Sequence, residues 1–444
     1  MRFGTDGVRG VAGVDLTHEF AHRLARASAQ VLAPTGDDDA PALVVIGGDT
    51  RESTPDLVAA LAAGFAAEGL EVEDLGVVPT PVVAFEAQRL GALGAMVSAS
   101  HNPFRDNGIK LFARGGTKLS DDVQVRIEER LDELHDDVEV PAPAEALVDS
   151  SASRPEYRQH VLSLLEGRSL APLRVVLDTA HGAAHAIGPA VLRAAGAHVE
   201  VLNDAPNGRN INDGCGATDP ATLAAAVLAA GADVGVALDG DADRLIAVDH
   251  RGRIIDGDHI IAICARDLRD RGALRDDTVV VTVMSNLGFR LAMEEEGIHV
   301  VETPVGDRYV LEALNEGGYS LGGEQSGHVI FADAATTGDG VLTAVVLLDV
   351  MARRGSLSEL ADAAMTSLPQ VLVNVPLAQR LPDAAARLAD AIDPLEQALG
   401  DHGRVLVRPS GTEPLLRIMV EAPTHELAES TAASLAATAA ARFA

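Results

Sequence analysis

The stretch from Ser98 to Lys110 combines hydroxyls, an imidazole, an amide and a lysine in the order Ser-Ala-Ser-His-Asn-Pro-Phe-Arg-Asp-Asn-Gly-Ile-Lys. It follows an apolar run at residues 93–97 that predicts a buried strand, and Pro103 and Asn107-Gly108 predict a turn. Packing does not require this mixture of side chains, whereas a reactive hydroxyl held on a tight loop does. An ordinary Ser/Asn/Pro turn would be the better interpretation if this loop stood alone.

A second loop offers three carboxylates at alternate positions, Asp239, Asp241 and Asp243, directly after the apolar run at residues 234–238. Three carboxylates can converge on one hard dication if Gly240 lets the chain turn. A solvated acidic turn is the alternative, and an EF-hand is disfavoured because the glutamate at its twelfth position is missing. The strand-end location favours a Mg²⁺ site with coordination positions left open for a phosphate oxygen.

A third loop near the C-terminus, residues 408–414, surrounds one glycine with cations, hydroxyls and backbone N–H groups. These groups can cradle a phosphate dianion, although a plain Pro/Gly/Ser turn explains the segment equally well. The candidate phosphate-binding residues are Arg408, Ser410, Gly411, Thr412 and Arg417.

A fourth polar segment, residues 322–328, lies between apolar runs and starts with two glycines. Glu324 and Ser326 stand at alternate positions, so both can point toward sugar hydroxyls, with His328 nearby. Gly-Gly turns carry polar residues in many proteins, which is the alternative here. The glycine-rich segment 4–10, which contains Arg9, is weak evidence by itself.

The composition excludes several classes of function. The chain has 444 residues, is 47% hydrophobic and carries a formal net charge of −31, which argues against nucleic acid and acidic membranes as partners. No apolar run is long enough to span a membrane, and the first residues have no signal-peptide layout, so we expect a cytoplasmic protein. Two cysteines without metal-ligand spacing fit a reduced compartment. An anionic substrate would need a locally cationic pocket.

Three segments repeat one plan of strand, polar loop, helix, glycine and strand, at residues 43–72, 173–202 and 279–302. Each predicts a right-handed parallel unit, and their wide spacing predicts three related mixed-sheet α/β domains. The C-terminal residues predict a smaller α+β domain. The fold class is therefore α/β, with four domains around a central cleft.

Domain boundaries follow from turns and composition. An acidic, proline-containing stretch at residues 136–154 predicts a linker, a turn follows Asp249, and Leu368-Pro369 marks a third boundary. We expect a serine-loop domain at 1–150, a metal-loop domain at 151–250, a sugar-loop domain at 251–368 and a phosphate-loop domain at 369–444.

Taken together, the four loops resemble those of the α-D-phosphohexomutase superfamily, in the family's order and over nearly the whole chain. Within it, four features are similar to those of the bacterial phosphoglucosamine mutase branch. They are residues 3–10, Asn210-Ile211-Asn212 with Cys215-Gly216-Ala217-Thr218, Val305-Gly306-Asp307-Arg308-Tyr309-Val310, and Gln325 where the phosphomannomutase/phosphoglucomutase branch usually has methionine. Ala217-Thr218-Asp219 and Pro304 depart from the residues most expected there.

This resemblance implies a reaction. Phosphorylated Ser100 would give its phosphoryl group to glucosamine 6-phosphate, and the 1,6-bisphosphate would turn end for end. The other phosphate would return to Ser100, releasing glucosamine 1-phosphate for the synthesis of UDP-N-acetylglucosamine and peptidoglycan precursors. Partners would be the phosphohexosamine substrate, a 1,6-bisphosphate activator and a second copy in a homodimer.

The resemblance also implies roles for the site residues. Ser100 and its phosphate would hold Mg²⁺ together with Asp239, Asp241 and Asp243. The groups near the transferring phosphoryl would be Arg9, Lys110 and Arg244, with Lys110 favoured for proton transfer because neighbouring cations can lower a lysine pKa.

His328 would share the proton-transfer role or orient the sugar. Glu324 and Ser326 would bind the sugar hydroxyls, and the Arg408 loop would bind the phosphate that is not reacting. The fourth domain would hinge near Leu368-Pro369.

Three alternatives stay open from the sequence. Phosphoglucomutase/phosphomannomutase activity needs the same loops. A Mg²⁺-dependent phosphatase would let water attack the phosphoserine and release phosphate steadily. A sugar-phosphate binding protein without catalysis would carry no phosphate on Ser100.

Overall fold

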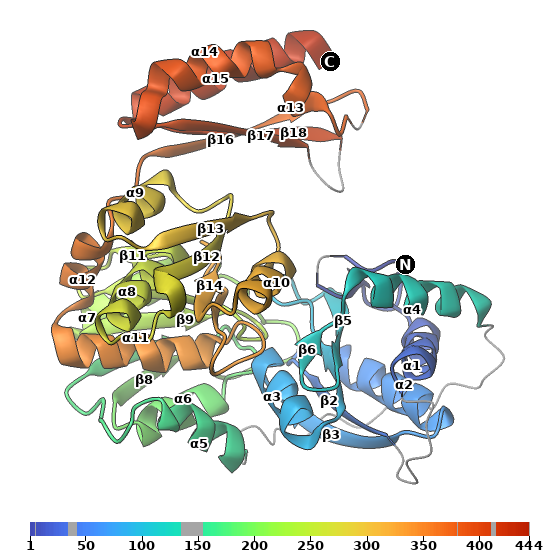
Figure 1. Ribbon diagram of the computed structural model, residues 1–444. Coiled ribbons are helices and arrows are strands. Elements are labelled where there is room, and N and C mark those ends of the chain that lie inside the picture. Colours follow the sequence, from blue (N-terminus) through green and yellow to red (C-terminus); the bar gives the residue numbers. More distant parts are fainter. Residues whose placement is uncertain (5, 34–41, 135–153, 380, 410–413, 444) are drawn as a thin grey trace. The chain divides into compact units, whose positions relative to one another are not determined.

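The computed structural model describes the chain except residues 5, 34–41, 135–153, 380, 410–413 and 444 (Figure 1). The described residues form two compact units. The larger unit comprises residues 1–284 and 298–363, and the smaller comprises residues 285–297 and 364–444. The predicted linker at 136–154 lies, apart from Arg154, outside the described residues.

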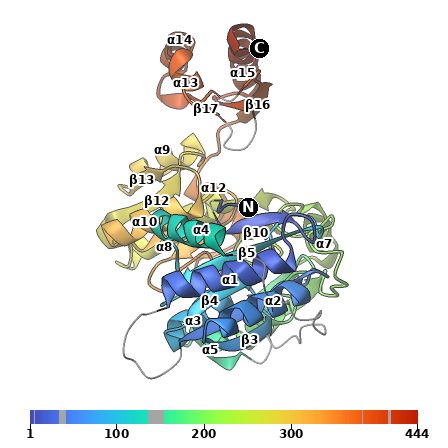
Figure 2. The same ribbon diagram turned by 90° about the vertical axis from the view of Figure 1, so that its right-hand side faces the viewer.

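The first sheet of the larger unit has the strand order β1-β5-β4-β2-β3, with β6 beside β5. β2, β3 and β4 are parallel, whereas β5 and β1 run antiparallel to their neighbours. Helices α1, α2 and α4 lie over one face of this sheet (Figure 2). Buried leucine, isoleucine and valine residues of β2 and β4 share a core with these helices. The elements are β1 (Val8–Val11), α1 (His18–Leu32), β2 (Leu43–Gly48), α2 (Thr54–Ala67), β3 (Glu71–Val77), α3 (Thr80–Leu90), β4 (Leu93–Val97), β5 (Asp106–Ala113), β6 (Thr117–Lys118) and α4 (Asp121–Glu133).

The second sheet repeats this plan with the order β11-β10-β9-β7-β8. Its three parallel strands are β7, β8 and β9, and β10 turns back antiparallel. The buried valines and leucines of β9 match the apolar run that predicted a strand there. The elements are α5 (Pro155–Ser163), β7 (Arg174–Asp178), α6 (Ile187–Ala194), β8 (His198–Leu202), α7 (Ala221–Ala230), β9 (Val234–Leu238), β10 (Leu245–Asp249) and β11 (Ile254–Ile255).

The third sheet has the order β13-β12-β14-β15, with only β15 antiparallel. The strand ends of all three sheets lead into polar loops, which is where α/β proteins place their sites. The elements are α8 (Gly257–Asp270), a 3₁₀ turn (Arg275–Asp277), β12 (Thr278–Thr282), β13 (His299–Thr303), α10 (Asp307–Gly317), β14 (Leu321–Gly323), β15 (Val329–Phe331), α11 (Gly340–Arg354) and α12 (Leu357–Ala364).

The smaller unit is an antiparallel sheet, β16-β18-β17, with helices on one face (Figures 1 and 2). α9 (Leu287–Glu295), from the predicted third domain, groups with this unit, because Asn286 exchanges two hydrogen bonds with the backbone of Leu368. The other elements are β16 (Gln370–Pro376), α13 (Ala384–Arg387), α14 (Ala389–Leu399), a 3₁₀ turn (Gly400–His402), β17 (Arg404–Pro409), β18 (Leu415–Glu421) and α15 (His425–Phe443). The prediction of three related α/β domains and a smaller C-terminal α+β domain is confirmed.

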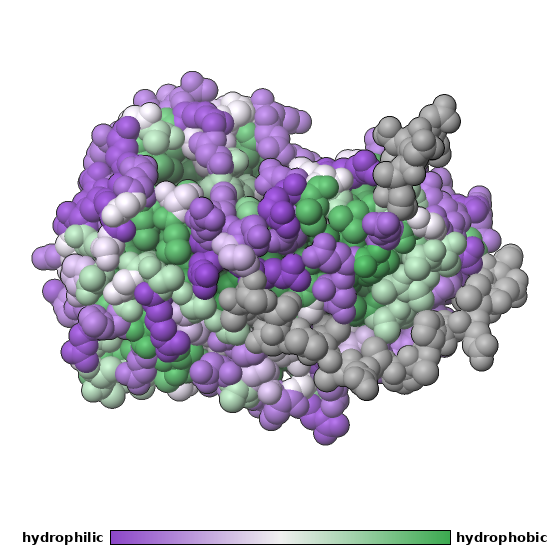
Figure 3. Space-filling model, turned by 90° about the horizontal axis from the view of Figure 1, so that it is seen from below, coloured by the Kyte–Doolittle hydropathy of each residue, from purple (hydrophilic) through white to green (hydrophobic). Residues whose placement is uncertain are grey.

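The helices of the described residues include none that is both long and apolar enough to cross a membrane. The face in Figure 3 shows many hydrophilic residues with apolar areas between them. Both cysteines, Cys215 and Cys264, are buried and free, as expected for residues that fill small internal spaces.

A buried carboxyl joins two helices of the larger unit, and a third helix packs against its tyrosine partner. The Tyr157 hydroxyl of α5 donates to Asp339 at 2.8 and 2.9 Å, and Asp339 caps α11 by accepting from the Leu342 N–H at 2.9 Å. The ring of Phe85, on α3, packs edge-on against Tyr157 with 5.7 Å between centroids. Burial raises the pKa of Asp339 to about 6.

The substitution Asp339→Asn is expected to make the protein relatively more stable as pH rises from about 4 to about 7. The folded state holds the Asp339 proton more tightly than the unfolded state does. This carboxyl's contribution to stability is therefore complete below its ordinary pKa of 3.8 and is lost as pH rises through about 6. Asparagine keeps the cap and can still accept from Tyr157 without ionising. The measurement is Tm against pH for the variant and the wild type.

Asp390→Asn is the matched control, because Arg442 lowers the pKa of that exposed carboxyl, so its pH trend has the opposite sign and lies below about pH 4, with little change between pH 4 and 7. Parallel Tm curves for Asp339→Asn and the wild type would show that Asp339 ionises as freely in the folded protein as in the unfolded chain.

Candidate active site

Ser100 lies on the loop after β4 and is 1% exposed. Its backbone has the left-handed φ of 52°, which a serine rarely adopts. Its Oγ donates to Asp239 Oδ2 at 2.5 Å and lies 3.3 Å from His101 Nδ1. The predicted nucleophile and the predicted metal loop, 139 residues apart, therefore meet directly.

The serine loop is held from behind by Arg51, whose side chain is completely buried. Its guanidinium donates to Asp49 at 2.8 Å and to backbone carbonyls of the loop at 2.5–3.1 Å. Asn212, from the second domain, donates to the carbonyls of Ser100 and Asn102 at 2.9 and 3.2 Å. These bonds direct the loop carbonyls toward Arg51 and Asn212 and fix the strained backbone of Ser100. The carbonyl oxygens that Arg51 binds belong to Ser100, Asn102, Pro103 and Asp106.

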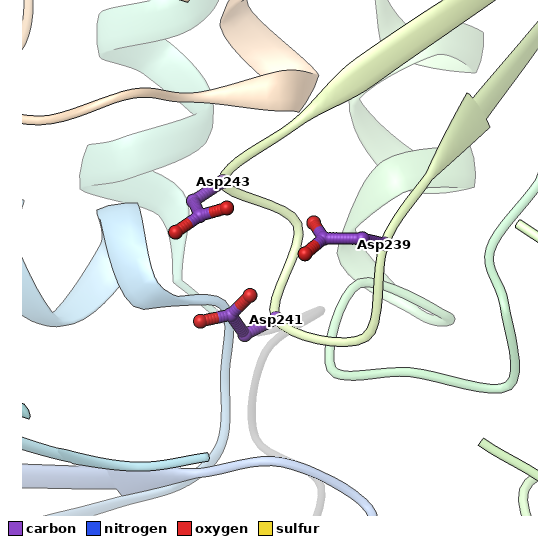
Figure 4. A group of neighbouring side chains, drawn as sticks. All are labelled: Asp239, Asp241 and Asp243. Carbon is purple, nitrogen blue, oxygen red and sulfur yellow. The ribbon is translucent and has the colours of Figure 1, made fainter. Parts of the chain in front are cut away.

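The acidic loop joins β9 to β10, and its three carboxylates point into one space (Figure 4). Asp239, Asp241 and Asp243 are all buried, and one oxygen from each lies within 4.8 Å of the others. Gly240 is required here, because a Cβ would lie 2.5 Å from the carbonyl oxygen of Ser100. Thr80, the first residue of α3, binds Asp241 twice, through its hydroxyl at 2.6 Å and its backbone N–H at 3.0 Å.

This group fits a magnesium ion. Oδ1 of Asp241 and Oδ1 of Asp243 are buried without a hydrogen-bond partner among the described residues, which is costly unless something else binds them. Hard carboxylate oxygens are the ligands that Mg²⁺ prefers. Burial, followed by Asp243 and Asp241, raises the pKa of Asp239, as expected for crowded carboxylates.

Lys110, on β5, reaches the same space and corrects one expectation. Its ammonium lies 2.7 Å from Asp6, 2.8 Å from Asp241 and 3.0 Å from Asp243. Burial alone would lower the pKa of Lys110, but these carboxylates raise it well above its ordinary value. The expectation of a lowered pKa is wrong, because the nearest charges are anions. These three carboxylates therefore favour the charged form of Lys110 in this arrangement.

Asp6, on the N-terminal loop, binds three cations. Its carboxylate lies 2.7 Å from Lys110, 2.8 Å from Lys118 and 3.4 Å from Arg9. Gly7 has a φ of 80°, and a Cβ there would lie 2.3 Å from the carbonyl oxygen of Ile109, so glycine lets this loop lie against β5. Burial would raise the pKa of Asp6, but Lys110 and Lys118 lower it far below its usual range.

A cavity of about 390 Å³ opens beside these groups, within the range of small-molecule sites. Arg9, Arg244 and His101 lie in its wall, and Arg244 Nε is 3.8 Å from Asp243. Burial, Arg244 and Arg9 lower the pKa of His101 to about 4. The lining residues are Arg2, Gly4, Asp6, Gly7, Arg9, His101, Asp243, Arg244, Val305, Gly306, Asp307 and Glu324.

The predicted sugar loop is divided between the cavity and the core. Glu324 lines the cavity and accepts from the Gly306 N–H at 3.2 Å, and the exposed Ser326 Oγ is 3.5 Å from Glu324. His328 is buried and accepts from the Gly338 N–H at 3.1 Å, and its Nδ1 lies 3.6 Å from Asp243. His328 therefore supports Asp243 and is not among the residues that line the cavity.

The predicted phosphate loop belongs to the smaller unit. Arg408 on β17 lies directly opposite Arg417 on β18. Burial, followed by Arg417, lowers the pKa of Arg408. Neither guanidinium forms an ion pair with a carboxylate of the described residues, so this pair of like charges favours an anion between the strands. The other predicted residues, Ser410, Gly411 and Thr412, lie outside the described part of the chain.

Comparison with known proteins identifies the family. Models of phosphoglucomutase/phosphomannomutase α/β/α domains I, II and III match residues 1–137, 155–252 and 256–368, and the model of the C-terminal domain matches 372–438. The chain belongs to the phosphoglucomutase/phosphomannomutase family.

Curated members of this family are similar over almost the whole chain. Proteins named phosphoglucosamine mutase from Frankia alni and Leifsonia xyli subsp. xyli are 55% and 54% identical, and each alignment covers 98% of this chain and 97% of the relative. The crystal structure of a phosphoglucomutase/phosphomannomutase family protein from Burkholderia thailandensis is 26% identical with a TM-score of 0.79, covering 98% of this chain and 97% of that chain.

Sequence reasoning missed several residues of this phosphohexomutase site. Arg51 and Thr80 act through hydrogen bonds that depend on the fold, and no local pattern indicates them. Asp6 and Asp307 lie inside segments that indicated only glycine-rich sequence or the branch of the family, and Lys118 lies in none of the predicted motifs. The scarcity of lysine in the sequence could have indicated these residues, because both lysines of the chain lie in the candidate active site.

The substitution Arg51→Met is expected to destabilise the serine loop selectively. Removing one partner of a buried ion pair costs about 3–5 kcal/mol of stability, and Arg51 pairs with Asp49 in this way. It leaves the carbonyls of the loop and the Asp49 carboxylate without their buried donor. Hydrogen exchange of the peptide Ser98–Lys110 should speed up strongly, with a lower Tm.

Arg353→Met is the control, because Arg353 on α11 binds Asp349 of the same helix and Asp267 of α8, and none of these residues belongs to the serine loop. It should lower Tm without changing exchange in the serine loop. Equal exchange of that peptide in both variants would mean that Arg51 does not hold the loop.

Proposed function

We propose that this phosphohexomutase interconverts glucosamine 6-phosphate and glucosamine 1-phosphate through phosphorylated Ser100 and a 1,6-bisphosphate intermediate. The observation that carries the proposal is the Ser100 hydroxyl, held 2.5 Å from a carboxylate of the three-aspartate cluster and beside a cavity with cationic groups in its wall. Relatives at 55% and 54% identity carry the name phosphoglucosamine mutase.

The cavity suits an amino sugar phosphate. Its cationic groups, Arg2, Arg9 and Arg244, match the phosphate, and its carboxylates match an ammonium at C2 of the sugar. Among these carboxylates, Glu324 has no ion pair within the described residues, whereas Asp6 binds two lysines. We assign Glu324 and Ser326 to the sugar hydroxyls and amine.

In the reaction, the free C1 hydroxyl of glucosamine 6-phosphate attacks the phosphorus of phospho-Ser100. The bond from phosphorus to Ser100 Oγ breaks as the new P–O bond forms, the proton of the C1 hydroxyl passes to Ser100 Oγ, and the 1,6-bisphosphate then turns over. Ser100 Oγ next attacks the 6-phosphate and gives its proton to the departing C6 oxygen, which leaves glucosamine 1-phosphate and phospho-Ser100. Positioning and charge neutralisation supply most of the rate in phosphoryl transfer, and the fixed loop geometry serves both.

The cations of this chain stabilise the charge of the transferring group. Lys110, Arg9 and Arg244 are proposed to face the phosphoryl oxygens. His101 Nδ1, 3.3 Å from Ser100 Oγ, is placed to exchange a proton with that oxygen. His328 holds Asp243 in place from the core. We assign the phosphate that is not reacting to the Arg408 loop with Ser410, Gly411, Thr412 and Arg417.

Asp239, Asp241, Asp243 and the phosphate on Ser100 would hold the magnesium ion. When bound, Mg²⁺ neutralises charge that develops on the transferring phosphoryl group. We further propose that the enzyme works in the cytoplasm and requires a 1,6-bisphosphate as activator.

The substrate assignment is tested by comparing glucosamine 6-phosphate with glucose 1-phosphate and mannose 1-phosphate in the presence of Mg²⁺ and a 1,6-bisphosphate. We expect about a hundredfold higher kcat/KM for the glucosamine substrate, because glucose and mannose carry a neutral hydroxyl at C2 in place of the ammonium that would pair with Glu324. Equal turnover of the three sugars would favour a phosphoglucomutase/phosphomannomutase instead.

Ser100→Ala is expected to lower turnover by at least about a thousandfold. The variant cannot carry the phosphoryl group, and the other groups of the site act only together with the nucleophile. The wild type should show one added phosphate on the peptide Ser98–Lys110 by mass spectrometry, and the variant none. Steady release of inorganic phosphate at the rate of sugar conversion would identify a phosphatase.

A further inference from the structure

Lysine is almost absent from this chain, and both copies lie in the candidate site. Arginine supplies 33 of the 35 basic residues, and only Lys110 and Lys118 are lysine. Both ammonium groups bind the same carboxylate, Asp6. Lys110 has a role in the proposed reaction, whereas the proposed function assigns none to Lys118.

Lys118 connects two walls of the cavity. Its ammonium lies 2.8 Å from Asp6 Oδ1 and forms a second ion pair with Asp307 Oδ2. Asp6 belongs to the N-terminal loop that also carries Arg9, and Asp307 begins α10 in the third domain. Both carboxylates line the cavity of about 390 Å³, while Lys118 itself does not.

The link is part of a closed series of polar contacts that includes two lysines and three carboxylates. Asp307 Oδ2 lies 3.8 Å from His328 Nε2, and His328 Nδ1 lies 3.6 Å from Asp243. Asp243 binds Lys110, which binds Asp6 in turn. The series therefore runs through all three α/β domains, and Lys118 is the member that joins the first domain to the third.

The shape of an ammonium explains why lysine stands here. An ammonium is a compact donor that can lie between two carboxylates, whereas a guanidinium is a wider planar fork. The space beside Lys118 holds only about 20 Å³, enough for about one water molecule. An arginine would therefore have to push Asp6 and Asp307 apart.

We propose that Lys118 is a positioning residue that fixes the separation of the cavity walls and so retains the bisphosphate intermediate while it turns over. This inference rests on the proposed function. A mutase whose intermediate escapes must recapture it from solution, so the width of the cavity controls how much free bisphosphate the enzyme needs.

The test measures two quantities for Lys118→Arg and Lys118→Met. The first is the concentration of glucose 1,6-bisphosphate that gives half-maximal mutase activity. The second is the dissociation rate of glucose 1,6-bisphosphate from the protein by stopped flow, which requires no turnover. We expect both to rise about tenfold or more, since changes at a binding surface act mainly on dissociation. The kcat at saturating bisphosphate should stay much closer to the wild-type value.

Two further variants separate positioning from folding. Lys118→Met with Asp307→Asn removes both charges, so neither group is left as an unpaired buried ion. It should keep the fold and still show the faster dissociation. Arg130→Lys makes an arginine–lysine exchange at the surface of the same domain, where Arg130 pairs with Glu133, and should behave as wild type.

Unchanged bisphosphate dissociation in Lys118→Arg and in the double variant would overturn the inference. So would a loss of kcat without a change in dissociation, because that result would place Lys118 in the chemical step. A wild-type protein that binds the bisphosphate without mutase activity would instead contradict the proposed function, and the dissociation rates would still decide the role of Lys118.

Discussion

The arrangement of the site depends on one electrostatic constraint, which is that several carboxylates are buried together. Asp239, Asp241 and Asp243 share one space, and buried like charges at such distances repel strongly unless cations lie between them. Lys110 meets this need by contacting Asp241, Asp243 and Asp6 at 2.7–3.0 Å. A magnesium ion would offset this repulsion more fully, because two of the carboxylate oxygens still lack hydrogen-bond partners among the described residues. The metal site and the lysine are therefore parts of one charge balance.

Backbone contacts between domains give this balance its geometry. The metal loop of the second domain is fixed on one side by the Thr80 N–H of the first domain, which donates to Asp241. On the other side, the Gly340 N–H of the third domain donates to Ala242. Because backbone groups make these two contacts, the contacts do not use the carboxylates of the loop. Asp239 Oδ2 accepts from Ser100, and Oδ1 of Asp241 and Oδ1 of Asp243 are left without hydrogen-bond partners among the described residues.

The strands and the chemistry-bearing loops could be predicted because their signals are local. Two runs of five residues, all of them buried in the structure, predicted the strands β4 and β9. The polar residues that follow each run predicted the serine loop and the metal loop. The pKa of Lys110 could not be predicted, because Asp6 and Asp241 reach it only through the fold. The same holds for the contact of Arg51 with the serine loop, whose carbonyls lie 49 to 55 residues away in the sequence. The support of His328 for Asp243 also required the packed structure.

The central claim is that the Ser100 oxygen stores a phosphoryl group in direct contact with the metal bound by the three aspartates. Electron–nuclear double resonance with Mn²⁺ in place of Mg²⁺ tests this contact in the phosphorylated protein. The account predicts a strong coupling to one ³¹P nucleus, absent in Ser100→Ala. Phosphorylated protein that binds Mn²⁺ but shows no phosphorus coupling above that of the variant would contradict it.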